Sequence, residues 1–208
     1  MSVLSVPEKD AEAGRAVVHT LHPDIASKHA TAFIGMAIFL GSWAVMFAGL
    51  FFAFAMHRVN ATHWPPVSLS SVPFGMPVSS TVIIALSSYT LVRYSGFVKT
   101  GDRAPARRWL LRTVALGITF CVVQAFMWHG VHTSGLIPSS GHFVGHLYLM
   151  TGFHALHVLV GLGLLLRLIP ITDAGLSPRL ATNARLVSMF WHFVGVAWFL
   201  IFLLLFAL

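Results

Sequence analysis

Histidine is the residue type in this sequence that could do chemistry, and its spacing gathers several copies on one surface. Twelve of the 208 residues are histidine, and four of these lie in the apolar segment 142–167. At 100° per residue, His142, His146, His154 and His157 fall within a sector of about 120° on one helix. Imidazole can ligate haem or a transition metal, transfer protons, or hydrogen-bond across a helix interface. This histidine face is therefore the first candidate for a functional surface.

Haem is one ligand that this face could serve. A haem held by two histidines would need imidazoles on facing helices at similar depth. His154 and His157 lie near the middle of their segment, whereas His192 lies only about 10 Å into the last apolar segment, at about 1.5 Å per residue. The depths match poorly, so a haem-binding membrane oxidoreductase stays an alternative and is not the favoured interpretation.

A second set of histidines flanks the short segment TSGLIPSSG. His129 and His132 precede it, and His142 and His146 follow it, so each pair shares one helical face. Zinc or copper can use such pairs. No cysteine or carboxylate accompanies them, and the lone Cys121 lies inside an apolar run. We therefore favour packing of these rings at a membrane interface over a metal site.

The elements that must position these histidines are apolar segments long enough to cross a bilayer. Hydrophobic residues make up 57% of the chain and charged residues only 9%, against roughly 25% charged in soluble domains. Five suitable segments follow one another, at 31–56, 78–98, 109–131, 143–169 and 184–208. Residues 1–30 are polar and contain no apolar core of a cleaved signal peptide. We predict an all-α protein with a polar cytoplasmic tail (1–30) and a five-helix membrane domain (31–208).

The histidine face is not expected to face lipid within such a domain. Imidazoles that faced lipid would lack hydrogen-bond partners. We therefore expect a neighbouring polypeptide to pack against this face.

The charged residues predict how the segments are oriented. Twelve of the thirteen Lys and Arg residues fall in the N-terminal tail or around the second and fourth connections, and only Arg58 falls on the other side. The positive-inside rule then places the N-terminus inside and the C-terminus outside. The net charge of +7 reflects membrane topology, and we expect no nucleic-acid partner. All six acidic residues share the inner side, which disfavours a self-contained ion pump or transporter.

Several stretches recur in a characteristic order along the chain. They are GMAIFLGSWAVMF, HWPP followed by MPVSSTVIIALSS, GITFCVVQAFMW, TGFHALHVLVGL and FWHFVGVAW. Together they resemble subunit III of the haem-copper terminal oxidases, the cytochrome c and quinol oxidase family, over nearly all of the membrane part. TGFHALHV is similar to the family signature TGFHGLHV almost letter for letter, and the ordered set is more specific than any one motif.

The resemblance implies a subunit that has no catalytic centre and binds no haem or copper itself. It implies two partners in a bacterial cytoplasmic (inner) membrane: a catalytic subunit I that holds haem and copper, and a copper-bearing or quinol-type subunit II. The chain would stabilise subunit I through helix packing and contacts with phospholipid. The residues at signature positions are Gln124, Gly152, His154, His157, Trp191 and His192.

Three positions that are acidic in the family are not acidic in this chain. They are occupied by Trp43, Met127 and Gly195. Functions that need those carboxylates to hold or relay protons do not transfer, so packing and lipid contact are the expected role. Accessory proteins of nitric oxide reductases and quinol oxidases share the motifs and stay open as alternatives.

Three arginines at the inner ends of the segments could contact lipid phosphates. They are Arg93, Arg112 and Arg167. The alternative is that these charges only set the topology of the chain.

Overall fold

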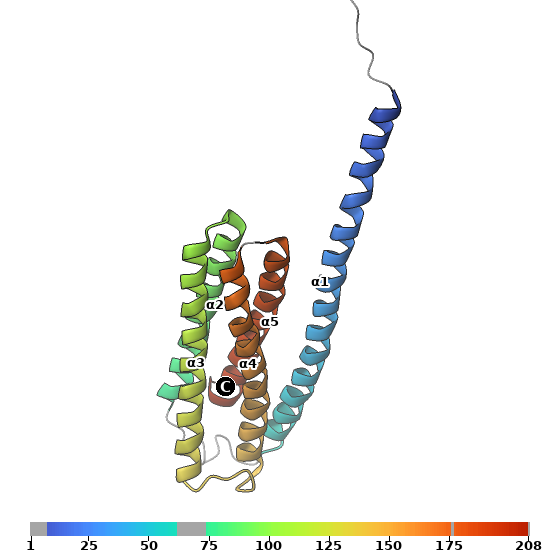
Figure 1. Cartoon of the computed structure of the whole chain (residues 1–208). Helices are drawn as coiled ribbons and strands as arrows, with labels where there is room; N and C mark the ends of the chain where they lie inside the picture. Colours follow the sequence, from blue (N-terminus) through green and yellow to red (C-terminus); the bar gives the residue numbers. More distant parts are fainter. Residues whose placement is uncertain (1–7, 62–73, 176, 208) are drawn as a thin grey trace, which may run out of the picture. The chain divides into compact units, whose positions relative to one another are not determined.

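The computed structural model describes the backbone of residues 8–61, 74–175 and 177–207, with side chains from residue 30 onward except that of residue 178. This part of the chain is helical and contains no strand. Its elements are α1 (Glu8–Val59), α2 (Gly75–Thr100), α3 (Arg103–Thr133), α4 (His142–Ala174) and α5 (Pro178–Phe202), and α5 continues into the π-helix Leu203–Ala207. Figure 1 shows the helices in sequence colours.

Five of the described helical stretches are long and apolar enough to cross a membrane. They are Ala30–Val59, Gly75–Thr100, Arg103–Thr133, His142–Ala174 and Arg179–Ala207. The prediction of an all-α protein is confirmed for the described residues, as is the number of helices able to span a membrane, five. The helices run past the predicted apolar limits because hydropathy marks only the part that lipid can cover, whereas backbone hydrogen bonding continues into the polar ends.

The helix ends are set by local chemistry. Gly101 ends α2 in the left-handed region, with φ of 85°, and its N–H donates to the carbonyl oxygen of Phe97. A side chain at this φ would be strained, which suits glycine to the position. At the start of α5, the N–H of Leu180 donates to Oγ of Ser177 at 3.2 Å, an N-cap that satisfies one free backbone donor.

Contacts divide the chain into two compact units, Met1–Phe39 and Leu40–Leu208. The described part of the first unit is the N-terminal part of α1. In the second unit, α2 packs against α3 and α5, and α4 packs against the same two helices. These four helices form a closed bundle, with their lengths side by side (Figure 1).

The centre of the bundle is the indole of Trp191 on α5, which is fully buried. Its Nε1 donates to Oγ of Ser87 on α2 at 3.0 Å. A Cβ added at Gly117 on α3 would lie 3.0 Å from the ring, and one added at Gly161 on α4 would lie 2.9 Å from it. One side chain therefore contacts the other three helices, and two glycines make room for it.

Further hydrogen bonds join the helices at other levels, each from an amide or indole donor to a hydroxyl. Nε1 of Trp198 donates to Oγ1 of Thr81 at 3.1 Å, and Nε1 of Trp128 donates to Oγ1 of Thr151 at 3.1 Å. These pairs join α5 to α2 and α3 to α4. Such bonds matter in lipid because a buried donor there has no water to bond.

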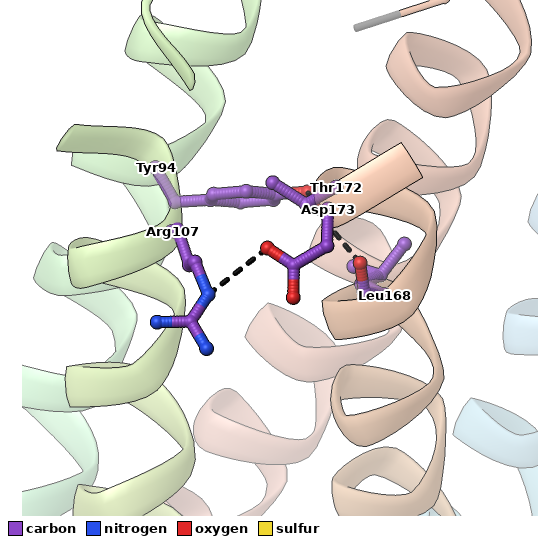
Figure 2. A network of polar contacts seen from close by, with 5 residues as sticks. All are labelled: Tyr94, Arg107, Leu168, Thr172 and Asp173. Atoms are coloured by element: carbon purple, nitrogen blue, oxygen red, sulfur yellow. Dashed lines mark hydrogen bonds and ion pairs between the residues drawn. The ribbon is translucent and has the colours of Figure 1, made fainter. Parts of the chain in front are cut away.

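A polar network joins α2 and α3 to the C-terminal end of α4 (Figure 2). The hydroxyl of Tyr94 lies 3.0 Å from Oγ1 of Thr172, which in turn donates to the carbonyl oxygen of Leu168 at 2.8 Å. Beside it, Nε of Arg107 lies 2.9 Å from Oδ1 of Asp173, in side chains that are 49% and 37% exposed. An ion pair this exposed contributes only about 0–1 kcal/mol, so the buried hydroxyl pair is the more important tie.

Replacing Gly161 by alanine should destabilise the bundle. The new Cβ would lie 2.9 Å from the Trp191 ring and 3.1 Å from Phe190, which is too close unless one of the helices shifts. Overpacking of this kind costs about 1–3 kcal/mol. The melting temperature of purified Gly161→Ala chain in detergent should therefore fall.

Gly163→Ala is the matched control for this experiment. Gly163 lies on the same helix, is exposed, and has no atom within 4 Å of its added Cβ. Because alanine favours the helix over glycine by about 1 kcal/mol, this variant should keep or raise the melting temperature. Equal effects of the two substitutions would contradict the close approach of α4 and α5 at Gly161.

Candidate functional site

The two signature histidines of α4 point toward different neighbours. The side chain of His154 is 1% exposed, and its ring lies 6.0 Å from that of Phe120 on α3 and 5.4 Å from that of Trp198 on α5, between centroids. Neither ring nitrogen has a hydrogen-bond partner within the described residues. His154 therefore lies among aromatic rings inside the bundle.

His157 faces the part of α1 that follows Leu40. Its Nδ1 lies 2.7 Å from the carbonyl oxygen of Phe153, so Nδ1 carries the hydrogen and donates it. The edge-on ring of Trp43 lies 4.1 Å away between centroids, and Phe47 lies at 5.4 Å. Among the described residues, Nε2 of His157 has no hydrogen-bond partner. An aromatic cage from α1 thus covers this imidazole.

The expectation that a neighbouring polypeptide covers the histidine face is wrong for its central part. His154 and His157 are 1% and 4% exposed within this chain alone, and Met150 between the flanking histidines is fully buried. Gly161, at the far end of the face, meets Trp191 of α5. Helices α1, α3 and α5 of the same chain supply the cover, so the polar face lies inward.

Three other signature residues lie on the same bundle helices. Gln124 is 6% exposed, and its Nε2 donates to Oγ of Ser80 on α2 at 3.0 Å. A Cβ at Gly152 would meet Trp128 only at 4.0 Å, an ordinary contact, so this glycine is not essential for close approach. His192, beside the central Trp191, is half-buried. The HWPP stretch lies outside the described residues.

The positions that are acidic in the resembling family fall at helix contacts. Trp43 packs its ring against His157, and Met127 is fully buried. A Cβ at Gly195 would lie 3.4 Å from Oγ of Ser88 on α2. Where side chains are described, the carboxylates are Asp102 and Asp173, which lie just before α3 begins and close to where α4 ends.

The histidines near the α3–α4 connection do not converge in the predicted way. His129 and His132 are exposed, and it is His57 of α1 whose ring lies 5.1 Å from His142 and 5.6 Å from His146. His142 and His146 also line a pocket of about 420 Å³. Within the described ranges, no group of three or more His, Cys, Asp or Glu residues has the geometry to hold a metal ion.

The three arginines proposed as lipid contacts divide into two kinds. The guanidinium carbons of Arg93 and Arg112 lie 5.6 Å and 4.5 Å from the ring centroid of Trp109. Arg167 is exposed on α4 and does not share this ring. Two of the three arginines therefore form a cluster.

A row of hydroxyl groups on α2 accepts hydrogen bonds from donors on other helices and was not predicted from the sequence. Ser80 bonds Gln124, and Ser87 bonds Trp191. These serines are seven residues apart and lie on one helix face with the buried Ile84, Leu91 and Tyr94. The seven-residue spacing of these small polar residues within an apolar segment could have predicted this helix face.

The bond between Trp191 and Ser87 should be measurable as an energetic coupling. Trp191→Phe and Ser87→Ala each remove one partner, and the double variant removes both. The double-mutant cycle, measured by denaturant unfolding in mixed micelles, should give a coupling of about 0.5–1.5 kcal/mol.

Ser79→Ala provides the control for this cycle. Ser79 is exposed and donates to the carbonyl oxygen of Gly75 on its own helix. Its effect should add to that of Trp191→Phe with no coupling beyond about 0.3–0.5 kcal/mol. If Ser87 and Ser79 gave the same coupling, the hydrogen bond would not be a stabilising contact.

Comparison with known proteins gives one consistent family. The family model described as "Cytochrome c oxidase subunit III" matches residues 15–208. The chain is 32% identical over 188 residues to "Probable cytochrome c oxidase subunit 3" of Mycobacterium leprae, covering 89% of each chain. It is 30% identical over 200 residues to "Cytochrome c oxidase subunit 3" of Corynebacterium diphtheriae, covering 93% of each. It is 29% identical over 197 residues to the protein of that name from Synechocystis sp., covering 94% of this chain and 81% of the relative. This chain belongs to the cytochrome c oxidase subunit III family.

Proposed function

We propose that this protein is a non-catalytic subunit of a haem-copper terminal oxidase that takes part in aerobic respiratory electron transport. The observation that carries the proposal is the position of the family's signature residues. Gln124, His154, His157 and Trp191 are all nearly or fully buried, where they pack against other helices of the bundle. The chain would then supply a packed membrane surface beside the catalytic subunit.

Haem and copper would belong to the partner subunits. The ring of His154 is flanked by Phe120 and Trp198, and that of His157 by Trp43, so an axial ligand would have to displace aromatic rings of the bundle core. Among the described residues, no group of three or more His, Cys, Asp or Glu is placed to hold a metal ion. These contacts support a structural role for the imidazoles. The partners are the catalytic subunit I and a copper-bearing or quinol-type subunit II.

The chain would lie in a bacterial cytoplasmic membrane with the polar tail of residues 1–30 inside. Five membrane-capable helices and relatives from bacteria support a multi-pass protein of such a membrane. The concentration of Lys and Arg at the α2–α3 and α4–α5 turns supports the inward orientation of those turns. Contacts with membrane phospholipid would add to the packing against subunit I.

Purification of the tagged chain in mild detergent should recover a haem-copper catalytic subunit. The expected result is a stable complex with haem absorption, identified by mass spectrometry and visible spectroscopy. An equally tagged, unrelated five-span protein from the same membrane should not bring it down. Recovery of the chain without any haem-copper subunit would contradict the proposal, and recovery with a nitric oxide reductase would favour the alternative complex.

The isolated chain should be colourless and free of stoichiometric transition metal. Expressed without its partners, it should give no haem bands and less than about 0.1 metal ion per chain, because the imidazoles are occupied by packing. If haem bands or bound metal appeared and were lost in His154→Ala or His157→Ala, the chain would be a redox protein itself.

A further inference from the structure

We propose that Arg93, Trp109 and Arg112 form a binding site for the phosphate of an anionic phospholipid at the α2–α3 end of the bundle. The guanidinium carbon of Arg93 lies 5.6 Å from the centroid of the Trp109 ring, and that of Arg112 lies 4.5 Å from it. Arg93 also lies 5.6 Å from the ring of Phe97. Two cations from neighbouring helices are thus held on one aromatic ring.

The charges of this cluster are available to an anion. Arg93 and Arg112 are exposed, and the one ion pair among the described residues joins Arg107 to Asp173. The other described carboxylate, Asp102, accepts from the hydroxyl of Thr100 at 2.9 Å. An anion beside this ring would be attracted by both positive charges.

Guanidinium groups suit a phosphate better than a simple point charge such as an ammonium group would. A guanidinium stacked on a ring by its face keeps the N–H groups of its edge free for hydrogen bonds. Those groups form a planar fork that binds phosphate oxygens in pairs. Contact with Trp109 therefore brings both arginines to one ring without a carboxylate partner among the described residues.

The cluster lies close enough to the ends of its two helices for the arginine side chains to reach the headgroup region of a bilayer. Arg93 precedes the end of α2 by seven residues and Arg112 follows the start of α3 by nine, or about 10–14 Å at 1.5 Å per residue. With 26 and 31 residues, both helices exceed the roughly 20 residues needed to cross the hydrocarbon core. The long arginine side chains can reach back toward the phosphates, and tryptophan favours this interface.

Apolar surface for acyl chains continues from the cluster toward the middle of the membrane. On α2, Val82 and Leu86 are 54% and 50% exposed and share a helix face with Arg93. On α3, the partly exposed Leu116 and Val123 share a helix face with Arg112. A free anion would use none of this surface, whereas a phospholipid would use both parts. The proposal therefore commits to a lipid. It rests on the membrane location of the chain and not on which catalytic subunit accompanies it.

Lipid-dependent stability of the purified full-length chain tests the site. In detergent, added phosphatidylglycerol should raise the melting temperature, since a ligand that binds the folded state stabilises it, and phosphatidylcholine should have a much smaller effect. R93Q/R112Q should need at least about tenfold more phosphatidylglycerol for half of this effect, because each lost arginine removes charge-assisted hydrogen bonds. R93K/R112K should weaken binding less, since it keeps the charge but loses the planar fork.

R103Q/R108Q is the matched control, because it also removes two exposed positive charges, here from the first two turns of α3, the helix that carries Arg112. This variant should respond to phosphatidylglycerol like the wild-type chain. If it lost as much response as R93Q/R112Q, the effect would be general positive charge and the site would be refuted. A full response in both R93Q/R112Q and R93K/R112K would also refute it. An equal response of the wild-type chain to inorganic phosphate would overturn the assignment to a lipid.

Discussion

The bundle depends on the burial of one indole at the meeting point of four helices. Trp191 donates its hydrogen bond to α2 and presses its ring against glycines of α3 and α4. In a bilayer, helices gain little from leaving an apolar solvent, so close packing and internal hydrogen bonds must hold them together. A large, flat side chain between two glycines supplies both. The other polar ties stand at levels above and below this centre and keep the same four helices in register.

The number of helices follows from the sequence because lipid imposes a simple rule. Each backbone polar group must be satisfied within its own segment, so long apolar runs become helices that cross the membrane. The histidine face of α4 follows from the same periodicity. The identity of the helices that pack against that face cannot be predicted in this way, because the periodicity shows only which residues share one side of a helix. His57 of α1 lies beside His142 and His146, a contact between helices that are not adjacent in sequence.

The residues of the candidate site could be predicted from the sequence, but their structural role could not. Gln124, His154, His157 and Trp191 stand out in the motifs, and each is nearly or fully buried in the structure. Their neighbours decide the role. His157 meets the ring of Trp43, a position at which the motif resemblance implied an acidic residue in the family, so its neighbour here is aromatic. The residues that complete these contacts, such as Ser87 and Thr81, carry no signature of their own and emerge only from the packing.

The hydroxyl groups that accept hydrogen bonds from the indoles of Trp198 and Trp128 each donate a second hydrogen bond to a peptide carbonyl. Thr81 accepts from Trp198 and donates to the carbonyl oxygen of Pro77 at 2.9 Å, and Thr151 accepts from Trp128 and donates to that of Leu147 at 2.6 Å. Each run of donors thus ends on a peptide carbonyl, which has no hydrogen to hand on. The indole N–H and the peptide carbonyl together fix the direction of the hydroxyl hydrogen, so the hydroxyl cannot turn without leaving a buried indole donor unsatisfied.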